Sequence, residues 1–191
     1  MMRVMPHAGA GGNLLPSPSR LREGEGLRAL LARRWTLLIA LLAVALHTLP
    51  IDSSWLVLSR DNLARGWMWT LFTGSLLHAS ALHVTMDVLG LLIVGWVFEP
   101  KWGNTWPWLV AFINAVVALG VLAIYPHINA YCGLSALDQG LLAAGVVALA
   151  WRGDWLPASI IGGTLIAKWV FEIIGGLPLM GTLTADPLKY G

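Results

Sequence analysis

Five long apolar stretches constrain this chain more than any other feature. A helix needs about 20 mainly apolar residues to cross the hydrocarbon of a bilayer. Stretches close to that length cover residues 35–51, 79–98, 105–125, 133–151 and 155–178. Only 12% of the residues are charged, too few to cover a water-facing surface, since soluble domains carry about a quarter. We therefore predict an all-α, polytopic membrane protein with five spans.

The predicted domain organisation has three parts. Residues 1–34 are rich in Gly, Pro, Ser and Arg, which predicts a disordered cytoplasmic tail. Residues 35–180 form the membrane domain, and residues 181–191 a C-terminal loop fragment. Within the membrane domain, the loop 52–77 mixes tryptophans with charged residues, which predicts an amphipathic segment in the outer interface. An ordinary structured loop is the alternative.

The basic residues predict the orientation of the chain, because they gather in cytoplasmic loops. Several arginines precede the first span, Lys101 lies between the second and third, and Arg152 lies between the fourth and fifth. These regions share one side of the membrane, so the N-terminus is predicted to be cytoplasmic. The net charge of +2 comes mainly from such flanking residues and indicates no nucleic-acid partner.

Ionisable residues inside spans are costly, so they are by default functional or paired. Lys168 and Glu172 are four residues apart on one helix face, which predicts a structural pair. Asp138 lies one turn after Ser135. His83 and Asp87 also share a helical face, with His78 just before it. A metal site and a merely hydrogen-bonded polar patch are alternatives there, but the zinc motif H-E-x-x-H is absent, and we expect no metal or other cofactor.

Ser135 follows Gly133 at the predicted outer start of the fourth span. Such a serine alone is usually an N-cap or a packing residue. Ala136, Gly140 and Ala144 form a face of small residues that lets another helix approach closely. We therefore predict that Ser135 meets His83 and Asp87 in a small polar cavity.

Three motifs in this order resemble the rhomboid family of intramembrane serine proteases. His78-x(4)-His83-x(3)-Asp87 is similar to the family's H-x(4)-H-x(3)-N, and Gly133-Leu134-Ser135-Ala136 to its G-x-S-x. The segment Trp69-Thr70-Leu71-Phe72-Thr73 resembles W-R-x-x-T. The resemblance covers roughly residues 35–180 and implies a rhomboid-like bundle with five of the expected six helices.

The resemblance also implies a role for each motif residue. Ser135 would be the nucleophile, and a histidine on the sixth span would take its proton. His83, position 87 and backbone N–H groups near Ser135 and Gly133 would stabilise the oxyanion, whereas His78 would organise the loop. Single-span membrane proteins would be the substrates.

The chain departs from the family pattern in three places. Asp87 replaces Asn, and an ionised carboxylate has no proton to donate to an oxyanion. Thr70 replaces Arg. No histidine follows His127, so the sixth-span motif A-H-x-x-G is missing. We expect the 191 residues to be inactive, either as a truncated gene product or as a five-span pseudoenzyme, and we do not expect His127 to act as the base.

Tyr131-x-Gly133-Leu134-Ser135 and Lys168-x(3)-Glu172 look most like the rhombosortase branch. That branch implies a bacterial inner-membrane enzyme acting on exported proteins with C-terminal Gly-Gly tails. Two rival functions remain open: a non-catalytic rhomboid-like protein that binds membrane helices, and a small transporter or channel subunit. Against the transporter, no inverted repeat is visible. The sequence predicts no oligomeric state.

Overall fold

The computed structural model describes residues 18–126 and 130–175, which fall into two compact units, 1–31 and 32–191. In the first unit, helix α1 spans Pro18–Leu31. The disordered tail predicted for residues 1–34 is therefore wrong over this range. The segment contains Leu, Arg, Glu and Ala, which have high helix propensity, and Pro18 occupies the first helical position, where a missing N–H is harmless.

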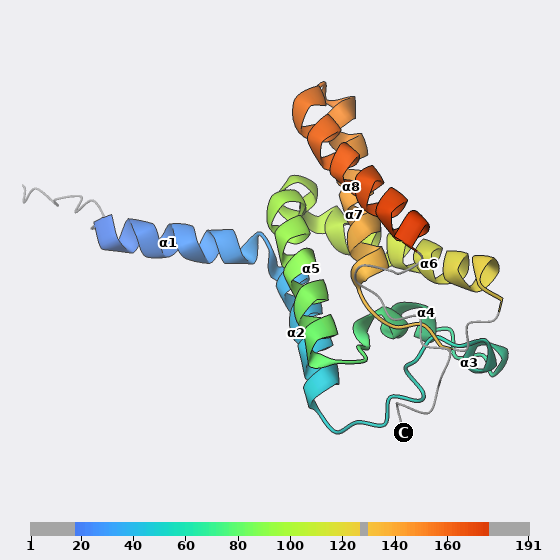
Figure 1. Ribbon diagram of the computed structural model, residues 1–191. Coiled ribbons are helices and arrows are strands. Elements are labelled where there is room, and N and C mark those ends of the chain that lie inside the picture. Colours follow the sequence, from blue (N-terminus) through green and yellow to red (C-terminus); the bar gives the residue numbers. More distant parts are fainter. Residues whose placement is uncertain (1–17, 127–129, 176–191) are drawn as a thin grey trace, which may run out of the picture. The chain divides into compact units, whose positions relative to one another are not determined.

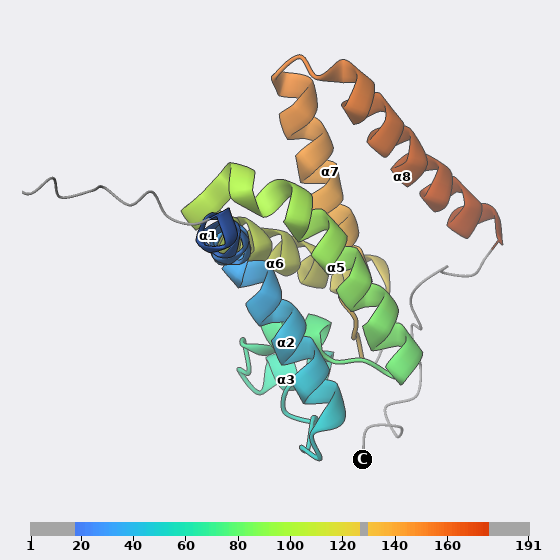
Figure 2. The same ribbon diagram turned by 90° about the vertical axis from the view of Figure 1, so that its left-hand side faces the viewer.

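The described part of the second unit is helical throughout, apart from loops and turns (Figures 1 and 2). Its helices are α2 (Arg34–Thr48), α3 (Arg60–Ala64), α4 (Thr70–Thr73), η1 (Gly74–Leu76), α5 (Ala81–Trp102), η2 (Gly103–Thr105), α6 (Trp106–Ile124), α7 (Ser135–Trp151) and α8 (Trp155–Gly175). The only β-type pairing among the described residues is an isolated bridge between Leu58 and Tyr131. The predicted all-α fold class is confirmed.

Five of these helices, α2, α5, α6, α7 and α8, match the five predicted spans to within four residues at each end. The helical stretch Ala81–Ile124, which comprises α5, η2 and α6, contains an apolar window of mean hydropathy 2.3, and α8 one of 1.4. Both are long and apolar enough to cross a membrane, whereas α7 is apolar but shorter. The number of membrane crossings stays a prediction. Large apolar side chains such as Ile93, Phe112 and Ile166 are exposed on these helices, as lipid-facing residues are.

Small residues bring the long helices together. Helix α2 packs along α5, and a Cβ added at Gly95 of α5 would lie 2.1 Å from Thr36 Oγ1 of α2. In α7, Gly145 faces the Phe98 ring of α5 and Gly140 faces Ile113 of α6 in the same way. Helix α7 therefore lies against α5 and α6, and it also packs on α8 (Figure 2).

The loop predicted to lie in the outer interface, residues 52–77, contains three short helices, α3, α4 and η1. Its Asn62 side chain donates hydrogen bonds to the backbone carbonyls of Ser54 and Val57, at 2.8 and 2.9 Å. Asn114 of α6 donates to the carbonyls of Leu71 and Phe72. These bonds satisfy backbone groups of the loop and fix it against the helices. Its depth relative to the bilayer stays a prediction.

Helix α5 is longer than the second predicted span. Helix α5 continues beyond Phe98 through Pro100 to Trp102. Proline removes the hydrogen bond to the carbonyl four residues earlier, and the side chain of Arg33 donates to that freed carbonyl, Trp96 O, at 3.2 Å. The chain then turns at Gly103, whose φ of 53° favours glycine.

Candidate functional site

The site is built where α7 begins. Gly133 has a φ of 107°, a conformation that L side chains rarely adopt. A Cβ there would also lie 2.7 Å from His83 Nε2 and 3.1 Å from Asp87 Oδ2. Glycine is therefore required twice, for the turn and for the close approach of the loop to α5. Ser135 is the first residue of the helix that follows.

One carboxylate oxygen, Asp87 Oδ2, is the centre of the site. It accepts hydrogen bonds from the backbone N–H groups of Leu134 at 2.7 Å and Ser135 at 3.2 Å. His78 Nε2 and His83 Nε2 each lie 3.2 Å from the same oxygen. Both imidazole nitrogens are close enough to the carboxylate oxygen for an ion pair, but neither contact has the geometry of a hydrogen bond. The Asp87 side chain is fully buried, so these four nitrogens form its immediate polar surroundings.

The two histidines reach Asp87 by different routes. His83 lies one turn before Asp87 on α5, which the i, i+4 spacing predicted. His78 lies in the loop before the helix. Ser80 is the N-cap of α5, and its side chain accepts a hydrogen bond from His83 N. His78 Nδ1 lies 3.0 Å from Leu76 O, and its ring meets that of His83 edge-on at 5.1 Å. His78 thus contacts the carboxylate as well as the loop.

The arrangement resembles an anion-binding site whose donors are taken by a carboxyl oxygen of the protein itself. Backbone N–H groups at a helix start attract negative charge, and here they converge with two imidazoles on one buried oxygen. From the sequence, Asp87 was expected to be a carboxylate with no proton to donate to an oxyanion. In the structure, the carboxylate oxygen of Asp87 itself takes up the N–H donors of Leu134 and Ser135.

The Ser135 side chain lines a cavity of about 250 Å³ between α5, α7 and α8. Its other polar lining residues are Asp87, Asp138, Gln139, Thr164 and Lys168. The structure thus brings His83, Asp87 and Ser135 together, and two of them line one cavity. Among the described residues, the Ser135 hydroxyl has no hydrogen-bond partner, so no base is in contact with it there.

Asp138 forms a second acidic wall of this cavity. It is 9% exposed, and its Oδ1 has no hydrogen-bond partner among the described residues. A Cβ at Gly90 of α5 would lie 2.8 Å from Asp138 Oδ2. The sequence reasoning singled out Asp138 but missed Gly90. The available signal was its position three residues after Asp87, on the same face of α5.

Gln139 was also missed, and it joins α7 to α8. Its Nε2 donates to Ser135 O at 3.1 Å, and its Oε1 accepts from Trp169 Nε1 at 2.5 Å. On the same helix as Trp169, Lys168 Nζ lies 2.5 Å from Glu172 Oε1, which confirms the predicted pair.

The remaining predicted positions have structural contacts. Thr70, at the position of the family arginine, is fully buried and donates to Trp67 O at 2.7 Å. No cluster of three or more His, Cys, Asp or Glu suited to a metal ion occurs within the described segments. His127 lies outside the described residues.

Comparison with known proteins gives one match. A family model described as a Rhomboid domain matches residues 65–182, more than half of the chain. No curated protein and no solved structure matches the sequence. The matched region contains His78, His83, Asp87 and Ser135.

Proposed function

The chain belongs to the rhomboid family, whose members are serine intramembrane proteases, and on this premise we propose that it is an intramembrane serine endopeptidase with Ser135 as the nucleophile. One observation supports this proposal above the others. The N–H groups of Leu134 and Ser135 both donate to one oxygen, Asp87 Oδ2, and His83 Nε2 lies 3.2 Å from the same oxygen, at the start of the helix that carries Ser135.

Acyl transfer needs donors at the position where negative charge develops. When Ser135 Oγ attacks a peptide carbonyl, the carbonyl oxygen becomes an oxyanion. The two backbone N–H groups and His83 Nε2 are the donors available to it. Since Asp87 Oδ2 now accepts those bonds, Asp87 has to turn away before substrate oxygen can enter. The adjoining cavity, which Asp87 already lines, offers the room.

The proton of Ser135 needs an acceptor. The family resemblance assigns this role to a histidine at the A-H-x-x-G position, and the 191 residues contain no such motif. His78 and His83 are poor candidates, because their Nε2 atoms face the Asp87 carboxylate. The 191-residue chain is accordingly proposed to bind substrate without cleaving it.

The proposed substrates are single-span membrane proteins, with C-terminal Gly-Gly tails of exported bacterial proteins as the finer assignment. The Tyr131-x-Gly133-Leu134-Ser135 sequence supports this rhombosortase-like choice. The distribution of Lys101, Arg152 and the N-terminal arginines supports a bacterial inner-membrane location with the N-terminus in the cytoplasm.

A fluorophosphonate probe tests the proposed nucleophile. The purified 191-residue chain should not be labelled, whereas a chain extended by a helix carrying A-H-x-x-G should be. Labelling should disappear in Ser135→Ala and in the variant lacking the added histidine. Labelling that survives Ser135→Ala would exclude Ser135 as the nucleophile.

A second candidate is a non-catalytic rhomboid-like protein that binds membrane helices. Asp87 Oδ2 already accepts the N–H groups of Leu134 and Ser135, so these donors are not available to an oxyanion. This contact favours the non-catalytic candidate. A correctly folded extended chain that stays unlabelled, yet crosslinks to a single-span substrate, would decide for this candidate.

A further inference from the structure

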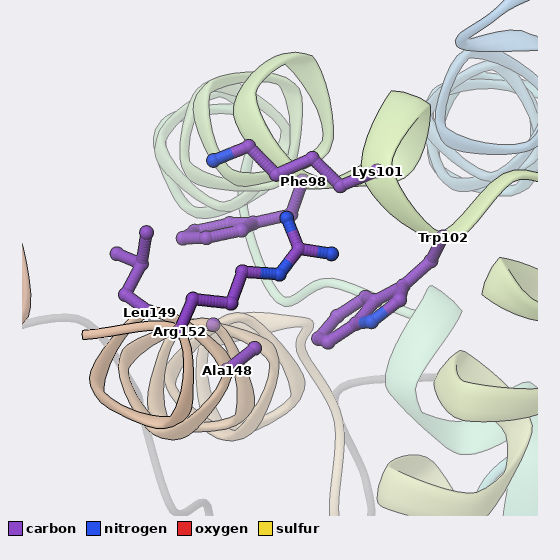
Figure 3. A pocket seen from close by; sticks show the side chains of 7 residues that line it. Phe98, Lys101, Trp102, Ala148, Leu149 and Arg152 are labelled. Atoms are coloured by element: carbon purple, nitrogen blue, oxygen red, sulfur yellow. The ribbon is translucent and has the colours of Figure 1, made fainter. Parts of the chain in front are cut away.

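A shallow hollow lies at the far end of α5 and α7 from Ser135 (Figure 3). We call it the basic hollow, and its lining residues are Phe98, Lys101, Trp102, Gly145, Ala148, Leu149 and Arg152. It encloses space of only about 10 Å³, roughly that of one water molecule. A ligand therefore has to lie across it rather than inside it.

Two cations from different helices border the basic hollow. Lys101 is in the last turn of α5, and Arg152 follows the last residue of α7. Lys101 Nζ lies 5.3 Å from the centre of the Phe98 ring, and Figure 3 shows the Arg152 side chain extending toward Phe98 and Trp102. Both residues are exposed, and neither forms an ion pair within the described part of the chain.

The nearby acidic residues do not neutralise these cations. Both carboxylate oxygens of Glu99 accept backbone N–H groups of α2, at 2.9 Å each. Asp154 lies two residues after Arg152, just before the N-terminus of α8, where helix amides attract negative charge. The hollow itself is lined by no acidic side chain.

Apart from the two cations, the hollow is apolar. Phe98 and Leu149 are buried, and Trp102 is half-buried at the end of α5. Aromatic residues beside Lys and Arg are typical of the boundary between hydrocarbon and headgroups. Two cations above an apolar floor match an elongated amphiphile with an anionic head. An arginine beside a lysine suits phosphate, since the guanidinium offers paired donors.

We propose that the basic hollow binds an anionic phospholipid, with its phosphate between Lys101 and Arg152 and its chains along Trp102 and Leu149. This site is independent of the proposed protease activity. It lies on the side predicted to be cytoplasmic, where bacterial and other membranes present anionic headgroups to such residues.

The test uses the full 191-residue chain in nanodiscs of phosphatidylcholine, with rising fractions of phosphatidylglycerol. The Tm is followed by tryptophan fluorescence, and lipid retention by native mass spectrometry. We expect phosphatidylglycerol to raise the Tm. Loss of one charge in Lys101→Gln or Arg152→Gln should weaken the apparent affinity about fivefold, and loss of both about thirtyfold.

Matched variants separate the site from general charge attraction. Arg60→Gln/Arg65→Gln removes the same charge elsewhere and should keep the full response to phosphatidylglycerol, as should Lys101→Arg. Each response is measured against the same variant in phosphatidylcholine alone, which also reports whether it folds. If the double variant fails to fold, the two single variants carry the comparison.

Two results would overturn the proposal. The first is an unchanged response to phosphatidylglycerol in the Lys101 and Arg152 variants, or an equal loss in the Arg60/Arg65 control. The second is equal stabilisation by free inorganic phosphate in phosphatidylcholine nanodiscs, which would assign the site to a soluble anion.

Discussion

At the scale of single residues, one oxygen, Asp87 Oδ2, holds the loop before Ser135 against α5 by accepting the N–H groups of Leu134 and Ser135. The i, i+4 spacing of His83 and Asp87 predicted their contact, because that spacing places both on one helix face. The two N–H bonds to Asp87 Oδ2 could not be predicted. They depend on how closely the Gly133–Ser135 loop approaches α5. The spacing of residues in the sequence carries no information about such a tertiary distance.

Removing the Asp87 carboxylate tests how much this contact stabilises the fold. Asp87→Leu leaves two buried N–H groups without acceptors, which we expect to lower the free energy of unfolding by about 2–4 kcal/mol. Asp87→Asn keeps an acceptor oxygen and should cost less than half as much. Unfolding by SDS titration in mixed micelles measures both. Equal losses in the two variants would show that the charge, rather than the acceptor, holds the loop.

Asp87→Asn also tests how the residue affects chemistry. In the chain extended by its sixth helix, we expect fluorophosphonate labelling of Ser135 to rise or to stay unchanged, because Asn brings an N–H donor. A single donor to an oxyanion contributes about 3 kcal/mol. A strong loss of labelling with the fold intact would instead show that the Asp87 carboxyl group itself is needed for the reactivity of Ser135.

Gly133 permits a test with an internal control. Gly133→Ala should destabilise the protein by about 1–3 kcal/mol through its positive φ alone, and further through the clash with His83 Nε2. Gly153 also has a positive φ, 84°, but a Cβ there meets nothing within 4 Å. The expected order of unfolding free energies is therefore wild type, Gly153→Ala, Gly133→Ala. If the two variants lose the same free energy of unfolding, the contact of Gly133 with α5 does not contribute to stability.

At the scale of elements, the five apolar stretches predicted the long helices to within a few residues. The end of the second stretch is the main exception, and its cause lies outside that stretch. The prediction ended the second span before Glu99-Pro100 because a charge beside a proline usually marks a boundary. In the structure the backbone of α2 binds the charge and Arg33 binds the carbonyl that proline frees. Neither compensation lies within the stretch itself.

Glu99 can be tested as the link between α2 and α5. Its two oxygens accept from different residues, Oε1 from Trp35 N and Oε2 from Thr36 N. Glu99→Gln keeps one acceptor and should lose roughly half of what Glu99→Leu loses, which we expect to be about 3 kcal/mol. Glu172→Gln, in the part-exposed pair with Lys168, serves as the control and should cost under about 1 kcal/mol. Chemical unfolding in micelles gives all three values, and a Glu99→Leu chain as stable as wild type would refute the link.

At the scale of the whole molecule, the fold class and the family could be predicted from the sequence, because hydropathy and the order of the motifs do not depend on how the helices pack. The cavity beside Ser135 was less accessible. Its walls come from three helices, and residues such as Gly90 and Gln139 carry no motif of their own. The number and direction of the membrane crossings depend on the bilayer and need an experiment.

Single cysteines can determine the topology. In a Cys132→Ser background, Arg65→Cys should react with a membrane-impermeant maleimide added outside spheroplasts. Lys101→Cys should react only after the membrane is opened. The reason is the asymmetry of basic residues between the two sides. Labelling of both positions from the same side would contradict the predicted arrangement of the first two spans.

The contact between Glu99 and the start of α2 has a consequence for biogenesis. Glu99 is made after α2, so we expect the amides of Trp35 and Thr36 to be hydrated at first. They find their permanent acceptors only when the end of the second span emerges. We therefore expect the start of α2 to be fully hydrogen-bonded only after the end of α5 has been made, and a nascent chain arrested before Glu99 to leave these two amides without their acceptors.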